Sequence, residues 1–159
     1  MAIIGIVAVD RAGAIGKGGT LPWHYSADLR FFKGQTTGAA CVMGYTTWLS
    51  LKKPLPDRLN VVLTRRAAVE PRESVLWARD KQSVLSLYEY LKCDIYVLGG
   101  AQVFELFRER IDRWLVTEVP LTVEDADTFL PPGLLEGFRA YDTRDLGEDL
   151  KVTFYERAR

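Results

Sequence analysis

The sequence predicts an α/β protein built around a mainly parallel β-sheet. Short apolar segments of strand length alternate along the chain with segments of helical periodicity, an order typical of helices that cross over a parallel sheet. The first apolar segment, Ile3–Val9, is nearly continuous, as expected for a strand covered on both faces. Near the C-terminus, residues 138–142 and 152–157 alternate polar and apolar side chains, which predicts an antiparallel hairpin. Such a hairpin would make the sheet mixed.

Local signals predict the elements between these ends. Residues 10–20 contain too many glycines for a regular element and predict a mobile loop, with Gly13, Gly16, Gly18 and Gly19. Ser26 is a candidate N-cap for a helix over Ser26–Thr36. Lys81–Leu91 predicts an amphipathic helix whose apolar face carries Val84, Leu87, Tyr88 and Leu91. The remaining expected elements are helices over residues 45–51 and 101–108, and strands over residues 39–43, 60–64, 75–77, 95–98 and 114–119.

Length and composition predict one domain over residues 1–159, with 48% hydrophobic and 26% charged residues. The formal net charge is zero, which argues against general attraction to nucleic acid or to anionic membranes. No apolar run approaches the roughly 18 residues of a membrane span, and the N-terminus lacks the basic region of a signal peptide. Cys41 and Cys93 lack metal-ligand spacing, which favours buried free thiols in a reducing cytoplasm. His24 is the single histidine, so we expect no metal centre.

Asp28 is the most informative candidate for a catalytic group. In the first turn of the expected helix it precedes Phe31 and Phe32 by three and four residues, so the three side chains can share one face. If that face is buried, desolvation raises the pKa of the carboxyl group, whereas the helix N-terminus favours the anion. This balance suits an acid that gives and regains a proton. The alternative is an exposed carboxylate that only decorates the first turn.

Three segments at expected strand ends favour phosphate binding. Glycines at two of these turns, in Val42-Met43-Gly44-Tyr45 and Val97-Leu98-Gly99-Gly100, would let backbone N–H groups approach a ligand before a helix begins. Arg65 and Arg66 follow a third strand and could pair with another phosphate. Together the three ends suggest a dinucleotide, although the Gly-x-Gly-x-x-Gly fingerprint is absent. Taken singly, each could be an ordinary tight turn or a solvated loop.

An ordered set of motifs resembles the dihydrofolate reductase family from residue 3 to residue 155. The matching motifs include Leu21-Pro22-Trp23, Ala27-Asp28-Leu29, Phe31-Phe32-Lys33, Thr46-Thr47-Trp48, Pro54-Leu55-Pro56-Asp57-Arg58, Val97-Leu98-Gly99-Gly100 and Asp127-Thr128-Phe129-Leu130-Pro131. The resemblance implies a three-layer α/β/α fold with a central mixed, mostly parallel eight-stranded sheet. It also implies reduction of dihydrofolate to tetrahydrofolate with NADPH in support of one-carbon metabolism. Competitive antifolates are expected ligands, and the protein is expected to be a cytoplasmic monomer.

The resemblance also assigns residues to the substrate and to catalysis. Asp28 is expected to hold the pterin, aided by Thr117, and to promote protonation together with Trp23. Phe32 is expected to pack on the pterin, and Arg58 to pair with the substrate's glutamate α-carboxylate. The remaining substrate-side positions are Ile6, Ala8, Leu55 and, more weakly, Lys53.

Further matches concern the cofactor. They imply a mobile lid over residues 10–23 and a peptide bond between Gly99 and Gly100 that is often cis in the family. The positions that match cofactor contacts are Ala8, Ile15, Gly16, Gly44, Tyr45, Thr46, Thr47, Leu63, Thr64, Arg65, Arg79, Leu98, Gly99, Gly100, Ala101, Gln102, Val103 and Phe104. Tyr45 departs from the family pattern, in which a basic residue often stands near the 2′-phosphate of the cofactor. Arg65 could supply that charge instead, with or without Arg66. Phe104 replaces a frequent tyrosine, and His24 is expected to face solvent.

Two other readings remain open at this stage. A pyrimidine reductase of riboflavin synthesis could share the fold and the cofactor, but it gives no reason for Trp23, Asp28, Phe32 and Arg58 to occur together. A non-catalytic folate or nucleotide binder could keep the pocket without turnover. The presence of both Asp28 and Thr117 argues against the binder.

Overall fold

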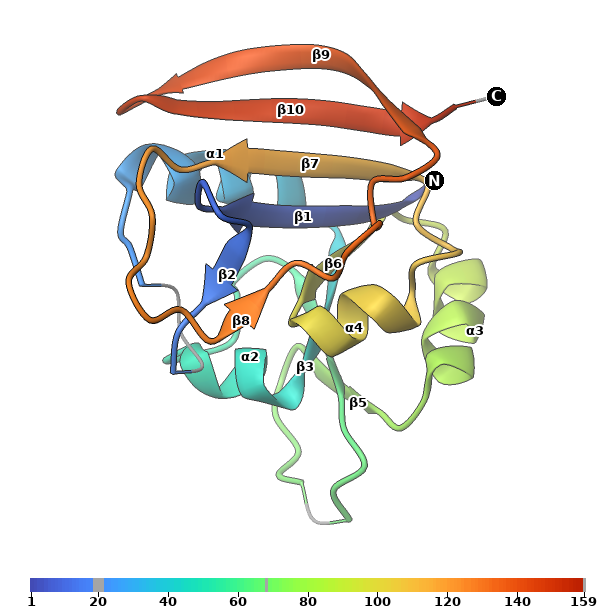
Figure 1. The fold of residues 1–159 in the computed structure, drawn as a ribbon. Helices are drawn as coiled ribbons and strands as arrows, with labels where there is room; N and C mark the ends of the chain where they lie inside the picture. Colours follow the sequence, from blue (N-terminus) through green and yellow to red (C-terminus); the bar gives the residue numbers. More distant parts are fainter. Residues whose placement is uncertain (19–21, 68, 159) are drawn as a thin grey trace.

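The computed structural model describes residues 1–18, 22–67 and 69–158. An eight-stranded sheet forms its centre, with the strand order β5-β4-β3-β6-β1-β7-β10-β9 (Figure 1). The strands of this sheet are β1 (Ile3–Val9), β3 (Ala40–Gly44), β4 (Leu59–Leu63), β5 (Val75–Ala78), β6 (Ile95–Gly99), β7 (Arg113–Glu118), β9 (Phe138–Gly147) and β10 (Leu150–Arg157). The helices are α1 (Ser26–Thr36), α2 (Tyr45–Ser50), α3 (Lys81–Leu91) and α4 (Ala101–Leu106).

The sheet is mixed, as the sequence predicts. Strands β5, β4, β3, β6, β1 and β7 run parallel to one another. Strand β10 pairs antiparallel with β7, and β9 pairs antiparallel with β10, so the C-terminal hairpin closes one edge. In Figure 1 this hairpin lies at the top of the molecule, beyond β7.

Helices cover both faces of the sheet and create three layers. Side chains on a strand alternate between faces, so Ile3 joins one cluster and Ile4 joins the other. The cluster of Ile3 includes Val84 and Leu85 of α3 and Val103, Phe104 and Phe107 at α4. The cluster of Ile4 packs against Phe31 and Phe32 of α1 and Trp48 of α2. The expected α/β/α architecture is therefore confirmed.

A close approach of β1 to β7 fixes the middle of the sheet. Gly5 lies against the ring of Trp114, which is fully buried. A Cβ at position 5 would lie 2.8 Å from Trp114 Cδ2 and closer still to Cε3 and Cζ3. Only glycine leaves room for the indole here, which explains a glycine inside an otherwise apolar strand.

The expected bounds of α1 and α3 are confirmed, and most other elements differ by one or two residues. The larger differences are β9, which runs on to Gly147 instead of ending at residue 142, and β10, which begins at Leu150 instead of residue 152. Ser26 was expected to be the N-cap, which is wrong: Tyr25 occupies that position, in an extended conformation without a side-chain cap. Cys41 and Cys93 are free, but Cys93 is only partly buried.

The loop expected over residues 10–20 contains regular structure, which corrects the prediction. Strand β2 (Ala14–Gly16) pairs antiparallel with β8 (Thr128–Phe129) as a separate two-stranded sheet. The pairing partner lies more than a hundred residues away, so local glycine content could not reveal it. Residues 19–21, which belong to the expected lid and include the first residue of the Leu21-Pro22-Trp23 motif, lie outside the described residues.

Asp10 anchors this region at the end of β1. It is 4% exposed, and its carboxylate accepts hydrogen bonds from the N–H groups of Ala12, Ala14 and Val123 at 2.7–2.8 Å. Burial raises the pKa of Asp10, but the backbone hydrogen bonds outweigh this effect and leave the pKa below its ordinary value. Among the described residues, no helix has the length and apolar character needed to cross a membrane.

Candidate active site

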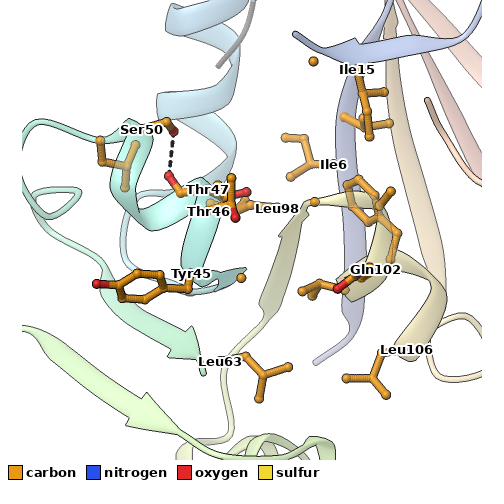
Figure 2. Close-up of a pocket in the computed structure, with 18 of the residues that line it drawn as sticks. Ile6, Ile15, Tyr45, Thr46, Thr47, Ser50, Leu63, Leu98, Gln102 and Leu106 are labelled. Atoms are coloured by element: carbon orange, nitrogen blue, oxygen red, sulfur yellow. Dashed lines mark hydrogen bonds between the residues drawn. The ribbon is translucent and has the colours of Figure 1, made fainter. Parts of the chain in front are cut away.

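A single cavity of about 1540 Å³ spans the carboxyl ends of β1, β3, β4 and β6. This is the edge at which open α/β sheets bind ligands. Figure 2 shows Ile6 and Ile15 toward one end, and Leu63 and Leu106 toward the other. Tyr45, Thr46 and Thr47 of α2 lie on one side, opposite Gln102 of α4. The cavity therefore extends from side chains of β1 and of residues 14–16 to side chains of β4 and α4.

Most residues predicted from the sequence do line this cavity. They are Ile6, Ala8, Ile15, Gly16, Asp28, Phe32, Gly44, Tyr45, Thr46, Thr47, Leu55, Arg58, Leu63, Thr64, Arg65, Arg79, Leu98, Gly100, Ala101, Gln102, Val103, Phe104 and Thr117. Trp23, Lys53 and Gly99 are not among the lining residues. The sequence interpretation missed ten lining residues, most of which extend the strands, helix faces and turns already selected: Val7, Leu29, Lys33, Ser50, Leu51, Asp80, Lys81, Gln82, Leu106 and Thr128.

An acidic group lies at one end of the cavity. Asp28, in the first turn of α1, is half-buried, and desolvation by burial raises its pKa above the ordinary value. Thr117 of β7 is 2% exposed and pairs across the ladder with Ala8 of β1, so both face the region that Asp28 borders. Phe32 follows Asp28 by one helical turn on the same cavity wall. The arrangement combines one protonatable carboxyl group, one hydroxyl group and an aromatic surface.

A fixed guanidinium group lies beyond Phe32. Arg58 is 7% exposed; its Nε donates to Pro56 O at 2.9 Å, and its Nη1 donates to Thr36 Oγ1 at 3.0 Å. Its Cζ lies 5.7 Å from the centroid of the Phe32 ring. These contacts hold the cation in one orientation at the cavity wall, which suits recognition of an anionic ligand group.

The two glycine turns lie next to each other in the middle of the cavity. A Cβ at Gly44 would be 3.1 Å from Val103 Cγ2 and 3.9 Å from Gly100 N, so the turns after β3 and β6 approach closely. A Cβ at Gly100 would have no atom within 4 Å, which means that the cavity reaches the backbone directly. The peptide bond between Gly99 and Gly100 is cis, as the resemblance led us to expect. This open backbone fits a phosphate-bearing dinucleotide.

Arginine side chains gather at the far end. Arg65 and Arg79 both line the cavity. Arg79 donates to Arg65 O at 3.2 Å and to Arg66 O at 3.4 Å, which ties the loop after β4 to the end of β5. Arg66 stacks over Tyr45, with Cζ 4.2 Å from the ring centroid. A guanidinium group therefore lies beside Tyr45, and Arg65 of the same loop lines the cavity itself.

The other predicted residues lie outside the cavity lining. Trp23 packs against the buried cluster of Ala27, Val119 and Leu150, and its Nε1 is buried without a hydrogen-bond partner among the described residues. Lys53 is exposed, and so is His24, as expected for the latter. Gly99 is buried beside Phe104.

Comparisons with known proteins agree with this geometry. The family model for dihydrofolate reductase matches residues 2–158. The chain belongs to the dihydrofolate reductase family. It is 37% identical over 145 residues to the dihydrofolate reductase of Mycobacterium tuberculosis, covering 87% of this chain and 86% of that protein. The enzyme of Haemophilus influenzae is 35% identical over 126 residues, covering 79% of this chain and 76% of that protein.

A solved structure of the family has the same fold. The dihydrofolate reductase of Enterococcus faecalis, complexed with NADP(H) and RAB-propyl, superimposes with a TM-score of 0.90. It is 29% identical, and the match covers 98% of this chain and 96% of that chain. Membership in the family makes the protein an NADPH-dependent oxidoreductase.

Proposed function

We propose that this protein reduces 7,8-dihydrofolate to 5,6,7,8-tetrahydrofolate with NADPH, and that Asp28 promotes protonation of the substrate. One observation carries the proposal: a half-buried carboxyl group with a raised pKa lines the same cavity as Gly100 and Arg65. A carboxyl group in this environment can hold a proton at a higher pH than a solvated aspartate.

The substrate occupies the end of the cavity formed by α1 and β7. Asp28 binds the polar edge of the pterin, and the Thr117 hydroxyl group adds a second hydrogen bond there. Phe32 packs on the ring system, while Ile6, Ala8 and Leu55 supply apolar contacts. Arg58, held by Pro56 O and Thr36 Oγ1, pairs with the α-carboxylate of the substrate's glutamate tail.

The cofactor occupies the rest of the cavity. NADPH supplies the hydride when it is bound. The open backbone at Gly100 and the adjacent residues of α2 and α4 hold its pyrophosphate, with Ile15, Gly16 and Leu98 around the nicotinamide. Arg65 binds the 2′-phosphate and so favours NADPH over NADH, with Arg79 holding its backbone in place.

Asp28 keeps the proton close to the pterin without touching the nitrogen that receives it. Its carboxyl group orients the substrate and water, and Trp23, whose buried indole N–H has no partner among the described residues, assists it from the cluster around Ala27. Burial reduces the contact of the Asp28 carboxyl group with bulk water, which strengthens its electrostatic interactions. The catalytic unit is a single domain over residues 1–159 that acts as a cytoplasmic monomer. It supplies tetrahydrofolate to one-carbon metabolism, and competitive antifolates bind in its cavity.

The direct test mixes the purified protein with dihydrofolate and NADPH and follows the loss of nicotinamide absorbance. We expect turnover with NADPH, and slower turnover with NADH at the same concentration. Controls without dihydrofolate or without protein should show no decay. Binding of both ligands without decay would favour a non-catalytic binder and reject the proposed reaction.

A further inference from the structure

We infer that Glu148 is a positioning residue for Asp28, acting through the first turn of α1. Glu148 belongs to the tight turn between β9 and β10, 121 residues away from Ala27, yet its Oε1 accepts a hydrogen bond from Ala27 N at 3.0 Å. Ala27 directly precedes Asp28. The inference rests on the proposed function of Asp28.

The start of α1 lacks a cap of its own. The first backbone N–H groups of a helix have no acceptor within the helix and need one from elsewhere. Tyr25, the N-cap residue, makes no side-chain hydrogen bond to the helix. The Glu148 carboxylate supplies an acceptor at this end, where a negative charge is also favoured. A residue of the hairpin thus completes the helix that carries the acid.

The backbone conformation of the turn does not explain why a glutamate stands there. Glu148 and Asp149 have φ values of 57° and 62°, a left-handed conformation that normally selects glycine or asparagine in two-residue hairpin turns. Nothing in the turn itself calls for glutamate at such a position. The reach of its side chain to Ala27 N gives a reason for its presence.

An apolar contact and a strand register extend the connection to Thr117. Leu150, 1% exposed and next in the chain after the turn, belongs to the same buried cluster as Ala27 and Val119. Two residues further along β10, Val152 is the ladder partner of Thr117 on β7. The end of the β9–β10 hairpin therefore contacts both α1, which carries Asp28, and β7, which carries Thr117. Through this contact Glu148 sets the position of α1 relative to β7.

Two substitutions at position 148 distinguish the length of the side chain from its ability to accept a hydrogen bond. Glu148→Asn suits the left-handed backbone, but its side chain is one methylene too short to reach Ala27 N. Glu148→Gln keeps both the length and an acceptor oxygen. Asp149→Asn changes the neighbouring turn residue, for which no contact with α1 is recorded among the described residues, and serves as the control.

The experiment measures steady-state constants and amide exchange at Ala27 in the full-length protein. For Glu148→Asn we expect faster exchange at Ala27, a kcat lowered roughly 5–100-fold by misplacement of Asp28, and a raised KM for dihydrofolate. The KM for NADPH should stay within about twofold, because α1 is remote from the arginine end of the cavity. Glu148→Gln and Asp149→Asn should behave like the parent protein.

Several results would overturn the inference. It fails if Glu148→Asn keeps the parent kcat and KM for dihydrofolate, or if Glu148→Gln loses as much activity as Glu148→Asn. It also fails if the KM values for dihydrofolate and NADPH rise equally, since that pattern indicates general loosening of the fold. An inactive parent protein would instead reject the proposed reaction, and this inference with it.

Discussion

Arg65 offers a test of how the cavity distinguishes NADPH from NADH. In Arg65→Ala, a charge-assisted contact with the 2′-phosphate is lost. Such contacts contribute about 1.5–3 kcal/mol when shielded from water. Arg65 is exposed, so screening places the expected loss nearer ~1–2 kcal/mol, or roughly 5–30-fold in the KM for NADPH. NADH has no 2′-phosphate, so its KM should hardly change.

The assay compares KM values for both cofactors at saturating dihydrofolate and low ionic strength. Arg66→Ala is the matched control, because Arg66 stacks on Tyr45 and is not among the cavity-lining residues. We expect it to change the KM for NADPH by less than about threefold. Added salt should reduce the effect of Arg65→Ala, since the contact is electrostatic. Equal increases in KM for NADPH and NADH would refute the assignment of Arg65.

Two further predictions concern the contributions of Gly5 and Asp10 to stability. Gly5→Ala should lower the free energy of unfolding by about 1–3 kcal/mol or more, because the added Cβ overlaps the Trp114 ring. Gly34→Ala is the control: its position in α1 is open, so it should leave the free energy of unfolding unchanged or raise it in the same urea titration. Asp10→Asn should destabilise the protein at neutral pH by about 1–3 kcal/mol. Because the folded pKa of Asp10 is lowered, its contribution is present above the unfolded pKa of about 4 and disappears as the pH falls through the folded value. Urea titrations of parent and variant should thus converge in acid; a constant gap would contradict this.

The accuracy of sequence reasoning depended on whether the signal was local. The bounds of α1 and α3 came from periodicity within one segment, and both were right. The parallel direction of the central strands followed from the alternation of strands and helices, whereas their order was not predicted. The cavity lining also followed largely from residues at strand ends, since parallel strands place their carboxyl ends at one edge.

Sequence reasoning did not predict the contacts between distant segments of the chain. The pairing of β2 with β8 and the hydrogen bonds from Ala27 N to Glu148 and from Val123 N to Asp10 each join residues more than a hundred positions apart. An aspartate directly after a buried strand is a recognisable turn signal, so the local half of the Asp10 network could have been predicted. The partner at Val123 could not, because nothing near Asp10 in the chain specifies it.

The carboxyl group of Asp28 also imposes a cost on the fold. Its folded pKa is raised, so the native state binds more protons than the unfolded state, and stability falls as the pH rises above the unfolded value of about 4. Asp28→Asn should therefore raise the free energy of unfolding at neutral pH and give no gain in acid. A variant that is more stable yet inactive would show that the group is kept for chemistry.

The most direct test is single-turnover oxidation of NADPH by the parent protein and by Asp28→Asn at neutral pH. We predict that the variant transfers hydride to dihydrofolate roughly 10²–10⁴-fold more slowly, while its affinity for NADPH is unchanged. In the parent protein the rate should decline as the pH rises and the acid loses its proton. Equal rates for parent and variant at neutral pH would contradict the role assigned to Asp28.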